Sequence, residues 1–224
     1  METSLSLRTP NLLVQHAIEA TLAGQPVEAR NALAGLPTRK TDLWIPPKLV
    51  ILTEPPPIGP CQRRKNVPED QQARLFQRDT FTCRYRGGQA LFLPALRLLS
   101  LLYPDVFPYD PHGLQEGRVS PARPDATPGH MHYWTHPASA DQMRPVVRHG
   151  TNDASNLTTA CYGCNDWKGE RMVEAPAPRP VAGWDGLSGT YETLYEYVIA
   201  HSPANDLPYF KKWRQALVTA DTAA

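Results

Sequence analysis

The stretch that decides the fold is DQMRPVVRHGTNDASNLTTACYGCNDWKG, residues 141–169. Its second half carries Cys161 and Cys164 with two residues between them. Two thiolates at this spacing can grip one Zn2+ from a single turn, because the backbone folds back between them. A redox pair or two buried structural thiols would have the same spacing. Zinc takes four ligands, so the pair needs two partners from elsewhere in the chain.

Cys83 is a credible third zinc ligand, because residues 83–88, CRYRGG, have the look of a zinc-knuckle turn. The expected partner of Cys83 at the end of that turn is Arg86, and a guanidinium does not ligate a metal. Cys61 is the remaining thiol of the chain, and a His would complete the set equally well. The residues therefore predict either three cysteines with a distant fourth ligand or a zinc site that has decayed.

In order and spacing, these residues resemble the HNH endonuclease family, in which a strand, a loop and a helix form the ββα-metal motif. The resemblance covers about residues 70–172. It includes residues 78–85, similar to the family's entry to its first knuckle, and flanks that look like an actinobacterial-type branch (Phe107-Pro108, Tyr133-Trp134 and Trp184-Asp185-Gly186). The matching positions are Asp141, Pro145, Asn156-Leu157, Cys161, Cys164, Asn165 and Lys168.

The resemblance implies metal-dependent hydrolysis of DNA phosphodiester bonds. Asp141 would hold Mg2+ or Mn2+, Asn165 would be a second ligand of that ion, and Asn156 would support the loop. Lys168 would lie near enough to touch a phosphate. A divalent ion in such a site neutralises the charge that builds on the phosphate oxygens, and a nearby His takes the proton of the attacking water.

Gln142 stands where the family has its general-base His. An amide has no useful basicity at neutral pH, and losing a general base typically costs about 10²–10⁴-fold in rate. Three explanations remain open: His149 or His136 could serve as the base, the chain could bind DNA without cutting it, or Gln142 could be an engineered change. His130, His132 and His136 also form a cluster in the sequence. Such a cluster is more often a set of exposed loop side chains than a metal site of its own.

Residues 61–86 hold seven basic and three acidic side chains, about +4 in a chain whose net charge is +1. The low net charge argues against a protein that binds nucleic acid over its whole surface. Contact with nucleic acid would need a local basic patch. A solvated helix face would show the same pattern of charge. We expect the following side chains to track phosphates: Arg63, Arg64, Lys65, Arg74, Arg78, Arg84 and Lys168.

The 224 residues allow one or two domains, and the 24 prolines predict many turns and extended connections. We expect an α+β fold with an HNH-like zinc-knuckle core flanked by N- and C-terminal helices. The predicted parts are a helical segment with a Pro-rich arm at 1–60, the HNH-like domain at 61–173, and a connector with helices at 174–224. Apolar spacing predicts helices within 11–36, 68–77, 91–103 and 187–217, a strand at 49–52, a strand and turn at 81–88, and a surface loop at 104–132.

The chain shows no apolar run of about 18 residues and no signal-like start, so we expect a cytoplasmic protein with no membrane partner. Expected partners are DNA, duplex or single-stranded, and a homodimer or larger assembly, since paired cuts need two sites. Two rival functions stand beside the nuclease. One is a catalytically inactive HNH-fold nucleic-acid-binding module in a larger assembly, and the other is a small zinc-stabilised interaction protein that binds no nucleic acid.

Overall fold

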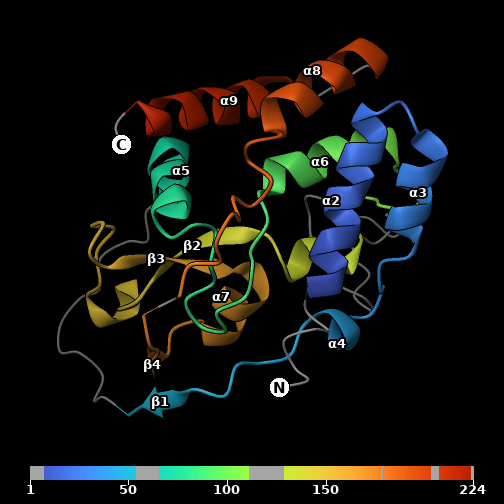
Figure 1. Cartoon of the computed structure of the whole chain (residues 1–224). Helices are drawn as coiled ribbons and strands as arrows, with labels where there is room; N and C mark the ends of the chain where they lie inside the picture. Colours follow the sequence, from blue (N-terminus) through green and yellow to red (C-terminus); the bar gives the residue numbers. More distant parts are fainter. Residues whose placement is uncertain (1–7, 54–65, 111–128, 178, 203–206, 223–224) are drawn as a thin grey trace, which may run out of the picture.

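The computed structural model describes residues 8–53, 66–110, 129–177, 179–202 and 207–222. Cys61, Arg63, Arg64 and Lys65 lie outside the described residues. The described chain combines helices with two small antiparallel sheets, so the predicted α+β class is confirmed. Helices α8 and α9 lie at one end of the molecule and the β1–β4 ribbon at the other (Figure 1).

The N-terminal helices follow the predicted spacing. Helix α2 spans Arg8–Leu22, and helix α3 spans Pro26–Ala34 with its proline in the first turn. Proline fits there because the first helical N–H groups have no intrahelical acceptor. Gly24 separates the two helices and takes a φ of 72°, which glycine adopts without strain. A short helix, α4 (Lys40–Leu43), leads toward the sheets.

Four further helices build the rest of the helical layer. They are α5 (Glu69–Arg78), α6 (Leu93–Leu102), α8 (Tyr191–His201) and α9 (Leu207–Asp221). Helix α5 packs on α9, and α6 packs on α8. Their buried faces join those of α2 and α3 in one hydrophobic cluster, so the three predicted segments of the chain share a core.

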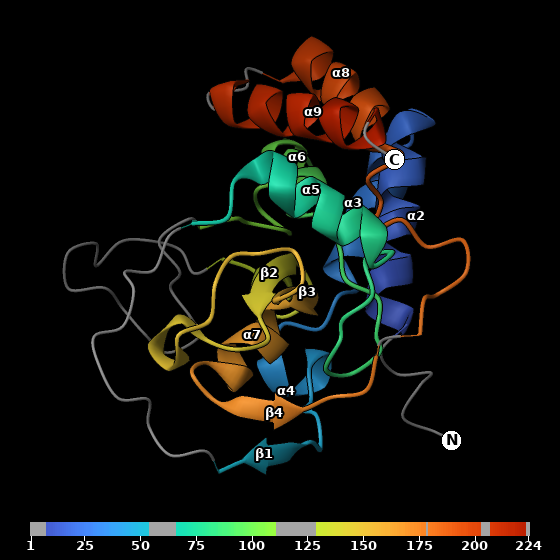
Figure 2. The same ribbon diagram turned by 90° about the vertical axis from the view of Figure 1, so that its left-hand side faces the viewer.

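The two sheets have two strands each. Strand β1 (Val50–Leu52) pairs with β4 (Met172–Glu174), which confirms the predicted short strand near residue 50. Strand β2 (Ala138–Gln142) pairs with β3 (Leu157–Cys161), and helix α7 (Tyr162–Lys168) follows β3 directly. The β2–β3 hairpin lies between α5 and α7, as Figure 2 shows from the side.

The prediction of a strand and a turn at 81–88 is confirmed for the turn and wrong for the strand, and the prediction for 104–132 is wrong. Residues 81–88 form a turn with a single bridge between Thr82 and Gln89 and no extended strand, because Thr80 and Phe81 both take left-handed backbone angles. The loop predicted at 104–132 is not a surface loop at its described ends. Phe107 is buried, and residues 131–134 form a buried 3-10 turn; residues 111–128 lie outside the described chain.

Among the described residues, none of the helices combines the length and the apolar character that crossing a bilayer requires.

Candidate metal and nucleic-acid site

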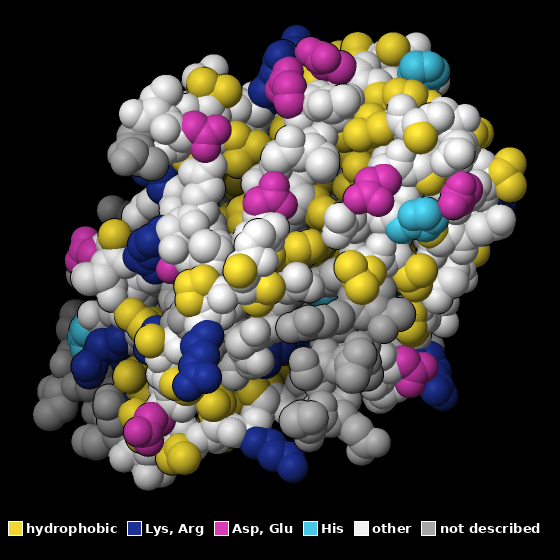
Figure 3. All heavy atoms as spheres, in the orientation of Figure 1, with side chains coloured by type: hydrophobic (Ala, Val, Ile, Leu, Met, Phe, Trp, Pro, Cys, Tyr) yellow, Lys and Arg dark blue, Asp and Glu magenta, His cyan; other side chains and the backbone are white. Residues whose placement is uncertain are grey.

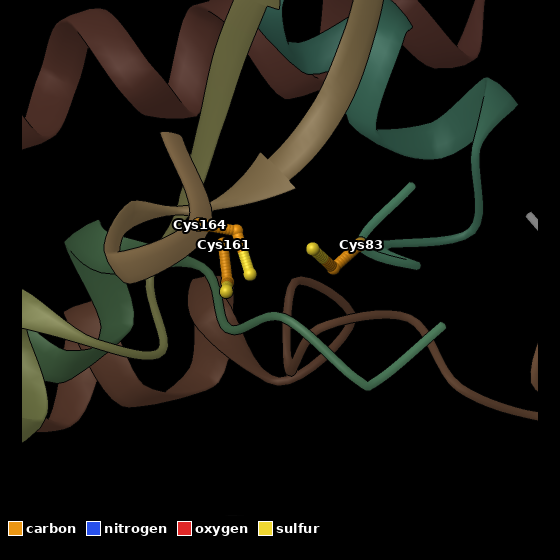
Figure 4. A group of neighbouring side chains, drawn as sticks. All are labelled: Cys83, Cys161 and Cys164. Atoms are coloured by element: carbon orange, nitrogen blue, oxygen red, sulfur yellow. The ribbon is translucent and has the colours of Figure 1, made fainter. Parts of the chain in front are cut away.

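Three cysteines meet at one end of the β2–β3 hairpin. Cys161 ends β3, Cys164 lies in the first turn of α7, and Cys83 comes from the turn that follows α5. All three are buried and free, and their sulfur atoms lie within 4.8 Å of one another. Figure 4 shows Cys161 and Cys164 facing Cys83 across a common point. This cluster could bind a metal such as zinc.

Backbone hydrogen bonds hold the Cys83 turn against the hairpin. The Cys83 N–H donates to Gly88 O at 2.8 Å, and the Gly87 N–H donates to Cys83 O at 2.8 Å. The Arg84 N–H donates to Thr159 O of β3 at 2.9 Å. These bonds close the turn and bring a cysteine from residue 83 beside a pair that lies about eighty residues later.

Trp44 covers the cysteine cluster, a role that no pattern in the sequence predicts. The Trp44 indole N–H donates to the Sγ atom of Cys164 at 3.4 Å. A Cβ atom on Gly163 would lie 2.8 Å from Trp44 Nε1, so the indole fits only because residue 163 is glycine. The contact links the residue that follows α4 to α7 over a separation of 120 residues.

The cysteines share one electrostatic environment with Arg86. Burial raises the pKa of Cys161 to about 12. For Cys83, burial also disfavours the thiolate, but hydrogen bonds from Cys161 and Cys164 and the charge of Arg86 outweigh it and lower the pKa of Cys83. Burial works against the charged form of Arg86 as well, yet attraction to the three sulfurs raises its pKa.

Asp141 lies at the opposite end of the hairpin, next to last in β2. Its carboxylate is buried and accepts a hydrogen bond from the Tyr85 hydroxyl. The Lys168 ammonium lies 3.3 Å from Oδ1 and 3.2 Å from Oδ2 of Asp141. Lys168 is only 1 % exposed and also donates to Gln142 O at 2.8 Å. The Lys168 ammonium therefore contacts the Asp141 carboxylate and is not exposed at the surface, where a phosphate would bind.

Burial is the largest effect on both members of this pair. It raises the pKa of Asp141 above its usual value, against the opposing charge of Lys168. It lowers the pKa of Lys168, against the opposing charge of Asp141. The pair exists because each charge offsets part of the desolvation that the other experiences.

Two clefts open beside Asp141. One has a volume of about 450 Å³ and extends along α7 to Glu170. The other, of about 610 Å³, extends toward the start of α5. Both are lined by Asp141, Gln142, Tyr162 and Asn165, so the predicted catalytic residues of β2 and α7 share one concave surface.

The side chains at this surface are held by hydrogen bonds. Gln142 Nε2 donates to Asn152 Oδ1 at 2.5 Å. Asn165 Nδ2 donates to Ser139 Oγ at 3.1 Å, and its Oδ1 atom, the kind of atom that binds a hard cation, takes no part in that bond. Gln142 and Asn165 are thus positioned on the strand and helix that flank Asp141.

Asn156 ties the two ends of the loop between β2 and β3. Its Oδ1 accepts from the Arg144 N–H at 2.8 Å, and its Nδ2 donates to Arg144 O at 3.0 Å and Thr151 O at 2.7 Å. The loop passes so close at Gly150 that a Cβ atom there would lie 1.6 Å from Arg144 O. Asn156 therefore fixes the path of the chain that leaves Gln142.

The structure brings neither alternative histidine to the clefts. His149 is exposed with a left-handed φ of 60°, and it is not among the described residues that line either cleft. His136 is buried, bonds Thr135 Oγ1 through Nδ1 at 2.8 Å and stacks on His132 at 4.3 Å. The expectation that these histidines are exposed loop side chains is wrong, because all three are buried. The rings of His130 and His132 contact Phe107, and His136 stacks on His132.

The predicted phosphate-binding arginines that are described all contact protein groups. Arg74 pairs with Asp70 in α5 at 2.5 Å. Arg78 pairs with Asp79 at 2.7 Å and also donates to Ala154 O and Leu157 O, which joins α5 to β3. Arg84 donates to Ala175 O at 3.1 Å. On the face drawn in Figure 3, Lys and Arg side chains are scattered rather than gathered in one stripe.

Helix α7 connects the two groups of reactive side chains, with Cys164 in its first turn and Asn165 and Lys168 further along. The contacts that hold the three cysteines together therefore also position the residues of α7 that face Asp141.

Comparisons with protein-family models, with curated proteins and with solved structures find no match for this chain.

Proposed function

We propose that this chain is an HNH-type nuclease that hydrolyses phosphodiester bonds of DNA with the help of a divalent cation. The observation that carries the proposal is the shared concave surface of Asp141, Gln142 and Asn165, built by a hairpin and the helix that follows it. A carboxylate and an amide oxygen are hard donors, which fit Mg2+ or Mn2+. An ion held by Asp141 and Asn165 would neutralise charge on the phosphate.

The residues of this site hold one another and the loop in place, and they contribute little to proton transfer. Asn156 fixes the loop after Gln142, and Asn165 is held against β2 by Ser139. Gln142 can donate or accept a hydrogen bond and so can orient a water, but it cannot take its proton. We therefore expect slow cleavage, with the rate limited by the missing base.

A second candidate is an HNH-fold module that binds nucleic acid without cutting it. Two observations favour it: the base position is Gln142, and the Lys168 ammonium lies 3.2 Å from the carboxylate that the metal would need. A tethered cation there competes with a divalent ion for Asp141. In this reading the clefts beside Asp141 would hold the backbone of the nucleic acid.

The cysteine cluster serves either function as a structural zinc centre. Zinc at Cys83, Cys161 and Cys164 would join the turn after α5 to the start of α7. Structural zinc sites contribute directly to folding, because their ligands are far apart in the unfolded chain. The proposed role of the metal is to hold Asn165 at its place beside Asp141.

The test incubates the purified chain with supercoiled plasmid in Mg2+ or Mn2+, next to Asp141→Ala and Gln142→His. Asp105→Ala is the matched control, because it removes an exposed carboxylate that pairs with Arg30, and neither residue lines the two clefts. We expect weak nicking by the parent, none by Asp141→Ala, and a gain of about 10²–10⁴-fold in Gln142→His.

Each pattern of results separates the candidates. A silent parent with an active Gln142→His variant would support the non-cleaving module on an intact scaffold. Silence of all three proteins together with salt-dependent plasmid binding would also favour that module, since phosphate contacts release counterions. Silence without any binding contradicts both functions.

A further inference from the structure

Arg86 is a half-buried cation, and two of its three guanidinium nitrogens lack a hydrogen-bond acceptor. Its Nε and Nη1 atoms are shielded from solvent and have no partner among the described residues. The side chain folds back over its own turn, since a Cβ atom on Gly88 would lie 3.2 Å from Arg86 Nε. A guanidinium keeps its proton under all ordinary conditions, so it cannot escape burial by becoming neutral. Such a group needs a negative partner.

The groups around Arg86 narrow the choice of that partner. Within the described residues, no carboxylate forms an ion pair with Arg86. Its charge acts on His132 and His136, but burial lowers the pKa of both imidazoles, and a neutral or protonated ring carries no negative charge. The remaining groups in electrostatic contact with Arg86 are the sulfur atoms of Cys83, Cys161 and Cys164.

The position of Arg86 in the sequence has a direct meaning for a metal site. Cys83 and Arg86 have the same spacing as Cys161 and Cys164, so Arg86 stands where a fourth cysteine would complete a tetrathiolate knuckle. Three thiolates with Zn2+ carry a charge of about −1, whereas four carry about −2. The single positive charge of the Arg86 guanidinium balances the charge of about −1 on the three-thiolate centre.

We propose that Arg86 replaces the fourth cysteine as the counter-cation of a three-thiolate zinc centre formed by Cys83, Cys161 and Cys164. On binding, each cysteine that is still protonated releases its proton to solvent, and three Zn–S bonds form. The product, with Arg86 beside it, is neutral, and that matters because its surroundings are Trp44, Tyr85, Ala90 and Ala160. The inference concerns metal affinity and stands independently of DNA cleavage.

Trp44 supports the same assignment. Its indole N–H points to Cys164 Sγ at 3.4 Å, and an N–H donor is better matched to a thiolate than to a thiol. The sulfur cluster thus receives one neutral donor from Trp44 and one positive charge from Arg86. Both favour the deprotonated cysteines that a metal requires.

The experiment measures zinc content, zinc affinity by chelator competition, and the sulfur-to-metal absorption of the Co2+-loaded full chain. The variants are Arg86→Met, Arg86→Lys and Arg86→Cys. Arg171→Met is the matched control, since its guanidinium stacks on Trp167 beside the knuckle and faces solvent. The parent should hold one zinc, and Arg86→Met should lose roughly 10–100-fold in affinity, the range seen when groups behind metal ligands are removed.

The other variants fix the interpretation. Arg86→Lys keeps the charge and should retain zinc better than Arg86→Met. Arg86→Cys should increase the sulfur-to-Co2+ absorption by about one third, because the number of thiolates rises from three to four. Arg171→Met should bind zinc as the parent does.

Several results would overturn the proposal. They are a parent without zinc, an Arg86→Met variant with parental affinity, or an Arg86→Lys variant as weak as Arg86→Met. If circular dichroism shows that Arg86→Met does not fold, Arg86→Lys and Arg86→Cys still decide. Zinc loss in folded Arg86→Lys, or unchanged Co2+ absorption in Arg86→Cys, would refute the assignment.

Discussion

At the scale of single residues, the Asp141–Lys168 pair changes the meaning of two side chains. The resemblance assigns Asp141 to a metal and Lys168 to a phosphate. In the fold the two side chains meet at 3.2 Å in a nearly dry environment, with Tyr85 as a third member. Sequence spacing places both residues near the same site, but the direction of a lysine side chain depends on what packs around it.

Lys168→Met should destabilise the protein strongly. The change leaves the Asp141 carboxylate buried with Tyr85 as its remaining side-chain partner, and breaking a buried ion pair from one side costs about 3–5 kcal/mol. Urea unfolding measures this loss. The double variant Asp141→Leu/Lys168→Met should recover most of it, since no unpaired charge is then left. A loss below about 1 kcal/mol in Lys168→Met would show that the pair is not formed.

The buried histidines should make the fold sensitive to acid. Burial lowers the pKa of His130 to about 4, from an ordinary value near 6.5. Between these values the unfolded chain binds the proton and the folded chain does not, so stability falls as the pH drops from about 6.5 to about 4. The shift corresponds to roughly 3 kcal/mol at the acid end for His130 alone.

Unfolding by urea at several pH values between 7.5 and 4 tests this dependence. His130→Phe should make the fall in stability smaller, because the aromatic ring is kept and one titrating group is lost. Burial also lowers the pKa of His132 and His136, so part of the acid dependence should remain. His149→Gln is the matched control, since His149 is exposed, and it should leave the profile unchanged. A parental profile that stays flat down to pH 4.5 would contradict the prediction.

At the scale of elements, local patterns predicted helices better than strands. Apolar spacing predicts helices within 187–217, and the structure buries Tyr191 and Leu194 of α8 and Phe210 and Trp213 of α9. A helix makes its hydrogen bonds within one segment, so spacing alone identifies it. The segment 81–88 lacks a continuous strand partner. The left-handed backbone angles of Thr80 and Phe81 favour a turn there.

The contact between α4 and α7 predicts the effect of filling the space at Gly163. Gly163→Ala places a methyl group 2.8 Å from Trp44 Nε1, so the indole must move away from Cys164. We expect a loss of about 1–3 kcal/mol, typical of overpacking, together with a change in tryptophan emission. Thermal unfolding and fluorescence measure both effects.

Gly35→Ala is the control for this substitution. Gly35 has a φ of −77°, and an added Cβ there meets only ordinary contacts at 3.4 Å. Its stability should stay within about 0.5 kcal/mol of the parent. Equal effects at both glycines would mean that Trp44 does not pack against Gly163.

At the scale of the whole molecule, one core joins segments that the sequence separates. Phe92 packs edge-on against Phe81 at 6.1 Å, Tyr191 at 5.1 Å and Trp213 at 5.4 Å. These residues belong to the middle and the C-terminal parts of the chain, and the N-terminal α2 packs on α8 in the same cluster. The predicted domain boundaries at residues 60 and 173 stay a prediction. The hydrophobic core contains residues from both sides of each boundary.

Phe92→Ala should therefore weaken the entire fold. Removing a buried aromatic ring costs about 3–5 kcal/mol, and all regions should lose stability together because they share the cluster. Far-UV circular dichroism and tryptophan emission should follow one transition at lower urea concentration. Two separate transitions would instead show that the helical layer and the hairpin region unfold independently.

The sequence by itself determined the helices, the α+β class and the grouping of Cys161, Cys164 and Asn165 on one short element. These depend on spacing within a few residues, which the chain order fixes directly. Only the tertiary structure decided that Arg86 lies beside the cysteines, that Lys168 lies on Asp141, and that Trp44 covers Cys164. These contacts join residues up to 120 positions apart, and they follow from burial and charge pairing, which no local pattern encodes.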